Sequence, residues 1–172
     1  MRIAYRARQF WQTLTTAPSH EELARIEKVL SPDLLDLFLR MHPSEQAHSI
    51  RIYQQVCQEG EQPSDLMVAA LLHDIGKTRY PLRLWERVLV VLGRKFFPRF
   101  VHEWGQGPPA GWRRAFVVAC QHPTWGAEMA TKAGASATAV SIIRRHQERL
   151  VAPPVNREEN MLHLLQLLDN QN

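Results

Sequence analysis

The sequence lacks several features that would place it in a simple structural class. Its 172 residues include only two cysteines, Cys57 and Cys120, and no CxxC pair. This argues against a disulfide framework and favours a reducing compartment. No run reaches the roughly 18 to 20 apolar residues that cross a bilayer. The basic start MRIAYRARQFWQTLTT lacks the apolar stretch and cleavage site of a signal peptide, so we expect a cytoplasmic protein.

Repeats, low-complexity tracts and strand signals are also missing. No segment recurs at a solenoid period, and no two segments alternate apolar and polar residues as a hairpin would. With 45% hydrophobic and 22% charged residues, the composition is that of a folded chain. The length suits one domain with a core of its own. Nearly every segment has helical periodicity, so the sequence predicts an all-α domain.

Pro, Gly and Ser residues divide the chain into expected helices. Ser44 is the expected N-cap of the third, and Gly76 is the expected stop of the fourth. We place the start of a later helix at His122 and Pro123. The expected helical segments are 20–30, 31–41, 44–60, 63–77, a helix within 82–97, then 111–121, 122–135, 136–148 and 156–171.

Positive charge and aromatic residues concentrate in one segment. From Arg79 to Arg114 the chain carries eight Arg or Lys and two acidic residues, although its net charge is only +4. Residues 80–112 hold seven of the fourteen aromatics. We interpret 80–112 as an inserted basic, aromatic helical segment that packs on the domain.

Two other interpretations of this segment stay open. It could be a lid whose arginines attract anionic substrates and whose rings stack on a base. It could instead make a membrane-surface or protein contact through residues 80–104. The cations available for phosphate or anionic lipid are Arg83, Arg87, Arg94, Lys95 and Arg99. No nucleic-acid-binding module accompanies them, so no specific nucleic-acid binding is expected.

Histidine and aspartate residues recur near the ends or on the apolar faces of the expected helices. The stretch AALLHDIGK, residues 69–77, ends a buried run with His73 and Asp74. Adjacent side chains on a helix diverge by about 100°, so this pair can approach one cation cluster from two directions. Polar groups that are costly to bury alone become acceptable around a shared cation. A site in the bundle core could thus gather this pair and four further residues: His48, His122, His146 and Asp169.

Ordinary structural roles are open to several of these residues. His122 could cap a helix, and His146 could lie at the negative end of a helix dipole. Asp169 could be a solvated residue near the chain end. Lys77 could be an exposed cation at the end of its helix.

The order of these residues resembles that of the HD-domain superfamily of metal-dependent phosphohydrolases. The run HDIGK is especially similar to the HD-GYP and cyclic-dinucleotide phosphodiesterase-like branches. HPTWGAEMA resembles their HPxxGA element, and RRHQE resembles their HHE element. The likeness covers residues 44–172, which we expect to form an HD-type metal-binding helical domain. Residues 1–43 would be a helical extension packed on it.

The resemblance implies an HD-like helical bundle with one or two divalent metal ions, drawn from Fe, Mn, Co, Ni, Zn or Mg. By this resemblance Asp74 would be a ligand of both ions and a catalytic residue. Lys77 would be the second catalytic residue and would contact substrate phosphate. Apart from the resemblance, we predict Arg79 and Arg83 as further substrate-binding residues. The other implied ligands are His48, His73 and Asp169 for the first ion, and His122 and His146 for the second.

These implications predict a bacterial-type phosphohydrolase acting on a phosphorylated small molecule such as a nucleotide. It would cleave a phosphomonoester or phosphodiester by attack of a metal-bound hydroxide, because divalent ions lower the pKa of bound water. The alternative is a non-catalytic metal-binding module for signalling or interaction. Gln147 favours that alternative, since it stands where the branch has a second histidine after His146. The GYP signature is also absent, so cyclic di-GMP is not assigned as the substrate.

Overall fold

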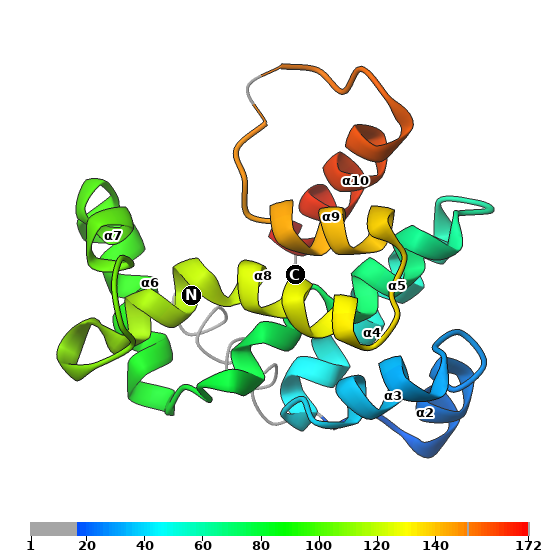
Figure 1. The fold of residues 1–172 in the computed structure, drawn as a ribbon, viewed down its shortest axis with the longest axis horizontal. Helices are drawn as coiled ribbons and strands as arrows, with labels where there is room; N and C mark the ends of the chain where they lie inside the picture. The colour runs from blue at the N-terminus through cyan, green and yellow to red at the C-terminus, as the bar shows by residue number, and fades with distance from the viewer. Residues whose placement is uncertain (1–16, 151, 172) are drawn as a thin grey trace, which may run out of the picture.

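The structure, a computed structural model, describes residues 17–150 and 152–171, and every regular element within these ranges is a helix (Figure 1). The all-α prediction is confirmed. None of the helices in these ranges combines the length and apolar character needed to span a bilayer. In chain order the elements are α2 (His20–Ile26), α3 (Pro32–Leu39), α4 (Pro43–Gln58), α5 (Ser64–Leu72), the 3-10 helix η1 (Ile75–Arg79), α6 (Leu84–Phe96), α7 (Pro98–Trp104), the 3-10 helix η2 (Gly111–Arg113), α8 (Arg114–Lys132), α9 (Ala137–Arg145) and α10 (Arg157–Gln171).

One hydrophobic core joins helices from both ends of the chain. It includes Ile26, Phe38, Leu71, Ile142 and Leu165, which come from α2, α3, α5, α9 and α10 and are at most 1% exposed. Helices α2 and α3 therefore pack on the same core as α5, α9 and α10. The first sixteen residues of the expected extension lie outside the described residues, and the boundary at residue 43 stays a prediction.

The N-cap of α4 is His42, two residues before the expected cap Ser44. The ring of His42 accepts a hydrogen bond through Nδ1 from the backbone N–H of Ser44, at 3.3 Å. Ser44 is therefore inside the helix, and the expectation that it caps α4 is wrong. This start places Glu45 in the first turn and His48 three residues later, on the same side of the helix.

The segment that carries HDIGK packs directly on α8. Helix α5 ends at Leu72, His73 is its C-cap, and the chain then forms η1. Gly76 lies within η1, where an added Cβ would stand 2.0 Å from the carbonyl oxygen of His122. The expectation that Gly76 stops the helix is therefore wrong. Its missing side chain instead lets η1 approach the backbone of α8.

Helix α8 is continuous for 19 residues, although the sequence led us to expect two helices there. The expected helix start at Pro123 is wrong, because Pro123 lies inside α8. A proline in a helix cannot donate to the carbonyl four residues earlier, which here belongs to Ala119. Arg94 of α6 donates to that carbonyl through Nη2 at 3.4 Å. The interruption in the backbone ladder thus provides a site that holds Arg94 against α8.

Helices α6 and α7 form one end of the long axis of the molecule, away from α2 and α3 (Figure 1). The segment 80–112 is helical as expected, with two helices and not one. Gly93 lets α6 pack on the ring of Phe116, because a Cβ there would lie 2.4 Å from ring atom Cε1. Buried Glu86 fixes the start of α6. Its carboxylate accepts from the backbone N–H of Arg83 at 2.8 Å and from Arg114 at 2.5 Å.

Replacing Glu86 by glutamine is expected to loosen α6. Burial raises the pKa of Glu86, but the hydrogen bonds from Arg114 and Arg83 outweigh it and hold the pKa below its ordinary value of 4.5. We expect Glu86→Gln to lower the free energy of unfolding at pH 7 by about 1 to 2 kcal/mol, because a buried charge-assisted hydrogen bond is lost. Urea denaturation measures this change, with the exposed Glu103→Gln as the control.

The sign of the pH dependence follows from the depressed pKa. The contribution of the Glu86 carboxylate is complete above its ordinary pKa and is lost as the pH falls through the lower folded pKa. The stability difference between Glu86→Gln and the parent should therefore shrink in acid. A difference that stays constant down to about pH 3 would contradict this assignment.

Candidate metal centre

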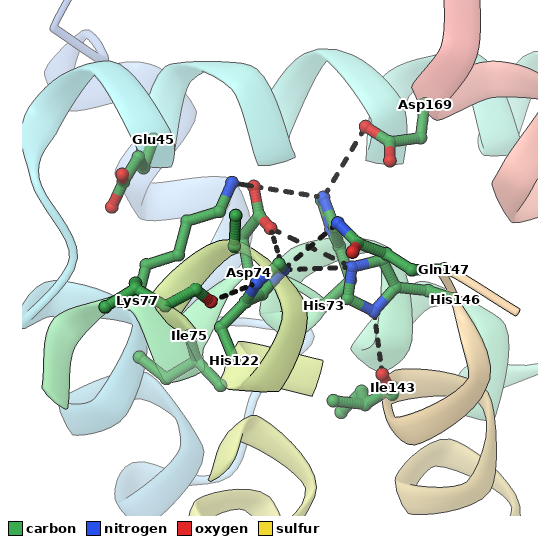
Figure 2. A network of polar contacts seen from close by, with 12 residues as sticks. Glu45, His73, Asp74, Ile75, Lys77, His122, Ile143, His146, Gln147 and Asp169 are labelled. Carbon is green, nitrogen blue, oxygen red and sulfur yellow. Dashed lines mark hydrogen bonds and ion pairs between the residues drawn. The ribbon is translucent and has the colours of Figure 1, made fainter. Parts of the chain in front are cut away.

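The structure brings together the side chains that the sequence placed at a metal site (Figure 2). They come from α4, the end of α5, the middle of α8, the end of α9 and the end of α10. Within each of two groups, one ligand atom per residue lies within 4.8 Å of the others. The first group is His48, His73 and Asp169, and the second is Asp74, His122 and His146.

The first group joins α4 to α10. His48 Nε2 lies 3.0 Å from Asp169 Oδ1, and His73 Nε2 lies 3.8 Å from the same oxygen. Burial raises the pKa of Asp169, but the hydrogen bond from His48 and the charge of His73 outweigh it and lower the pKa. Asp169 is thus an anion held between two imidazoles, and not a solvated residue at a frayed end.

The second group surrounds the carboxylate of Asp74. Its Oδ1 lies 3.1 Å from His122 Nε2 and 3.9 Å from His146 Nε2. Its Oδ2 lies 3.5 Å from His73 Nε2 and 2.6 Å from Lys77 Nζ. The two oxygens of one carboxylate therefore face the two groups, which is the arrangement that a bridging ligand requires.

Three of the imidazoles are oriented in the same way by the backbone. His73, His122 and His146 each direct Nδ1 to a main-chain carbonyl, which can only accept a hydrogen bond. Nδ1 must therefore carry the hydrogen, and the lone pair of the neutral ring is on Nε2, toward Asp74. Metal-binding histidines are commonly fixed in this way. The accepting carbonyls are those of Ala70, Val118 and Ile143, at 3.0, 3.0 and 2.7 Å.

The buried Nε2 of His73 provides a test of whether a cation fits. The side chain is fully buried, and among the described residues this nitrogen has no hydrogen-bond partner. An unpaired buried polar atom is costly, and a bound cation would remove that cost. Two ligand atoms on one metal ion lie at most about 4.2 Å apart. The four carboxylate–imidazole separations of 3.0 to 3.9 Å in the two groups meet this limit, so these pairs fit a divalent ion.

Asp74 and Lys77 form an ion pair at the edge of the cluster. Burial raises the pKa of Asp74, but the charges of Lys77 and His73 hold it well below its usual range. Burial lowers the pKa of Lys77, but the charges of Asp74 and Glu45 outweigh it and raise the pKa. Both groups are therefore charged at neutral pH. Lys77 is not the exposed helix-end cation that the sequence left open.

The imidazoles that face Asp74 differ in their proton affinity. Burial, with the charge of His73, lowers the pKa of His146 to about 3. Burial also lowers the pKa of His122, although the negative charge of Asp74 opposes this. For His73, burial lowers the pKa, but the negative charges of Asp74 and Asp169 outweigh that effect and raise it. His122 and His146 are thus neutral at pH 7, the form that coordinates a metal.

Two cavities reach the cluster from its outer side. One of about 500 Å³ is lined by residues that include His146 and Asp169. The other, of about 240 Å³, is lined by residues that include Lys77 and His122. Arg94 and Gln147 line both cavities, and Arg94 Nη2 donates to Gln147 Oε1 at 3.4 Å. A small molecule can therefore approach the cluster, and Arg94 stands at both approaches.

Comparison with known families agrees with this geometry. Residues 42–170, most of the chain, match the family model described as HD domain. The chain belongs to the HD domain family. HD domains are generally metal-dependent phosphohydrolases, and the superfamily inferred from the sequence is confirmed. The likeness to the HD-GYP branch stays a prediction. No curated protein and no solved structure shows a match to this chain.

Three residues of this HD domain were predicted to bind substrate: Lys77, Arg79 and Arg83. Lys77 lies beside Asp74 at the metal centre. Arg79 points elsewhere: it pairs with Glu128 at 3.6 Å and lines a separate cavity. Arg83 occupies the N-cap position of α6 and is not among the residues that line the two cavities at the cluster. Substrate contact by Arg79 or Arg83 stays a prediction without support from their positions.

The predicted cap role of His122 is wrong, because His122 lies inside α8 and is fully buried. His146 is the C-cap of α9, which agrees with the alternative role at the negative end of a helix dipole. Its ring is nevertheless buried and faces Asp74. Gln147 is exposed at the edge of the cluster, with its Nε2 at 3.5 Å from His122 Nε2.

Sequence reasoning missed Glu45. Its carboxylate accepts from Arg87 at 3.0 Å, and its negative charge helps to raise the pKa of Lys77. A signal was present in the spacing: Glu45 precedes His48 by three residues on a helix, so both side chains lie on one side. The contact with Arg87 was not readable, because it joins two segments that no local pattern connects.

Proposed function

We propose that this HD domain hydrolyses a phosphoester of a small molecule, such as a nucleotide, with the help of one or two divalent ions. The observation that carries the proposal is the unpaired Nε2 of buried His73, which faces two carboxylates at a cluster with solvent access. A purely structural histidine would have both nitrogens satisfied or exposed.

Asp74 would connect the two metal positions. Its oxygens face the two ligand groups separately, and its negative charge is kept by Lys77. A divalent ion bound here would lower the pKa of a bound water and neutralise charge that develops at phosphorus. The remaining ligands would be His48, His73 and Asp169 in one position, and His122 and His146 in the other.

Lys77 and Arg94 would bind the phosphate. The ammonium of Lys77 remains charged, and its side chain is 29% exposed beside the smaller cavity. Such a point charge can stabilise phosphate oxygens directly. Among the described residues, Arg94 makes two long hydrogen bonds, both 3.4 Å, to a carbonyl and an amide. Its guanidinium can exchange these neutral acceptors for phosphate oxygens, which form stronger, charge-assisted bonds.

Replacing Arg94 by alanine is expected to raise KM for a phosphoester by about tenfold or more, because a charge-assisted hydrogen bond to the substrate is lost. The value of kcat should change less, since Arg94 is absent from both ligand groups. Steady-state kinetics of the metal-loaded protein measures both constants. Arg144→Ala, an exposed change on α9, is the matched control. An unchanged KM would remove Arg94 from substrate binding.

The test of the proposed function is hydrolysis of p-nitrophenyl phosphate and bis(p-nitrophenyl) phosphate by protein purified without chelator and loaded with each candidate metal. We expect turnover that is lost in folded His73→Ala and His122→Ala variants and kept in His20→Ala, which alters an exposed histidine of α2. Full metal loading without turnover of any phosphoester would instead support the non-catalytic metal-binding module that Gln147 suggested.

A further inference from the structure

The outer side of α6 and α7 carries large apolar side chains that the described residues leave half exposed. In α6 six such residues are between 39% and 61% exposed: Leu84, Trp85, Val88, Val91, Leu92 and Phe96. Phe97, Phe100 and Trp112 add three more at 50% to 57%. We name these nine residues the outer apolar face. Soluble monomers rarely expose so many large apolar groups together, and such patches mark interaction sites.

Helical geometry puts the α6 members of this face on one side. At about 100° per residue, the six residues fall within an arc of about 140°. The residues buried against α8, which include Glu86, Val90 and Gly93, fall on the opposite arc. Helix α6 is therefore apolar on two sides. The inner side has α8 as its partner, whereas the outer side faces solvent.

Ring contacts join the end of α6, α7 and η2 into one aromatic cluster. The ring of Trp104 lies 5.9 Å from Phe97, 5.8 Å from Phe100 and 5.4 Å from Trp112, measured between centroids. It also lies 5.0 Å from Phe116, which belongs to the core beneath. The exposed rings are thus held by packing and need no rearrangement to make a contact.

Cations stand among these rings. Lys95 Nζ lies 5.4 Å from the centroid of Phe96, and the guanidinium of Arg113 lies 5.3 Å from the centroid of Trp112. Arg99 is exposed in α7, between the two phenylalanines of that turn. No carboxylate of the described residues lies within 4.0 Å of the charged nitrogens of these three cations. Exposed Trp and Phe with interspersed Lys and Arg is the pattern of surfaces that enter the interface of an anionic bilayer.

A second copy of the chain would fit this face less well. A two-fold contact sets the same surface against itself. Lys95, Arg99 and Arg113 would then meet their own like charges, with exposed Glu103 as the one acidic side chain of α7 to offset them. An anionic bilayer offers phosphate groups to the cations and an apolar interior to the rings.

We propose that the outer apolar face docks the protein on an anionic lipid surface. The rings and aliphatic side chains of α6 and α7 enter the interface, and Lys95, Arg99 and Arg113 bind lipid phosphate. Helix α6 also carries Arg94, which stands at both cavities of the metal centre. Docking through α6 therefore holds the metal centre close to the lipid surface, whatever reaction it performs.

Co-sedimentation of the full chain with vesicles tests the proposal. We expect pelleting with vesicles of phosphatidylcholine and phosphatidylglycerol, and about tenfold weaker partition onto phosphatidylcholine alone. The triple variant Trp85→Ser, Leu92→Ser, Phe96→Ser should lose partition by about tenfold or more. Its control is Leu39→Ser, Val155→Ser, Leu167→Ser, three exposed apolar residues elsewhere. Circular dichroism confirms that both variants are folded.

Two double variants test whether vesicle binding depends on the cations of the outer apolar face or only on the net charge of the protein. Lys95→Glu with Arg99→Glu should weaken binding to the anionic vesicles, whereas Lys28→Glu with Lys132→Glu, which changes the net charge equally at exposed sites, should not. The proposal is overturned by absence of pelleting with anionic vesicles at low salt, or by pelleting that survives the triple change. It is also overturned if the triple change abolishes a dimer in sedimentation while vesicle binding is absent.

Discussion

Asp74→Asn is expected to reduce phosphoester hydrolysis by about a thousandfold or more, since several kcal/mol of metal-dependent stabilisation is lost. The carboxylate of Asp74 faces three imidazoles and the ammonium of Lys77. An asparagine keeps the shape but leaves the lysine as an uncompensated cation beside the metal positions. The variant should therefore bind divalent metal more weakly as well as turn over more slowly.

The measurements for Asp74→Asn are turnover and bound metal per chain on the folded variant. Asp33→Asn, an exposed change in the first turn of α3, is the matched control and should leave both unchanged. If Asp74→Asn kept more than about a tenth of the parent activity, the bridging role derived from its two oxygens would be wrong.

Gly76→Ala is expected to lower the free energy of unfolding by about 3 kcal/mol or more, through overpacking against a rigid neighbour. The added Cβ would stand 2.0 Å from the carbonyl oxygen of His122 and 2.6 Å from the backbone nitrogen of Gly126. Both are backbone atoms of α8, so no side-chain rotation relieves the clash. A shift of α8 would also move His122 away from Asp74, and hydrolysis should fall with stability.

Gly107→Ala is the control for this change. A Cβ at Gly107 meets nothing within 4 Å, but its φ of +88° disfavours a side chain. The cost there should be only the backbone strain, about 1 kcal/mol. Urea denaturation of both variants shows whether the stability loss of Gly76→Ala comes from the clash with α8 or only from backbone strain. Equal losses of stability would contradict the close approach of η1 to α8.

The sequence was sufficient for the helical class and for the six histidines and aspartates of the two groups. Helical periodicity is local, and His73 with Asp74 directly follows the buried helix α5, so the place of that pair could be read from neighbouring residues. The order in which His48, Asp169 and the other residues of the two ligand groups occur along the chain resembles the HD-domain pattern, and this resemblance is visible without a structure. Their use as metal ligands remains a prediction.

The errors at Gly76 and Pro123 arose where contacts between distant segments decide the outcome. Gly76 looked like a helix stop because glycine commonly ends helices. Its actual role is to let η1 approach His122 of α8, which lies 46 positions later in the sequence. Pro123 looked like a helix start because a proline inside a helix costs about 3 kcal/mol. In the structure α8 continues through it, with Arg94 on the carbonyl that the proline leaves free. Neither partner is visible in a local pattern.

The central claim is that side chains distant in the sequence gather around a cation, and metal content tests it most directly. The full chain, purified without chelator and then supplied with Fe, Mn, Co, Ni, Zn or Mg, is compared with His73→Ala by elemental analysis. The account predicts one or two tightly held ions per chain and a clear loss in the variant, because His73 Nε2 is the buried nitrogen without a partner among the described residues. A parent protein that retains none of these metals after gel filtration would contradict it.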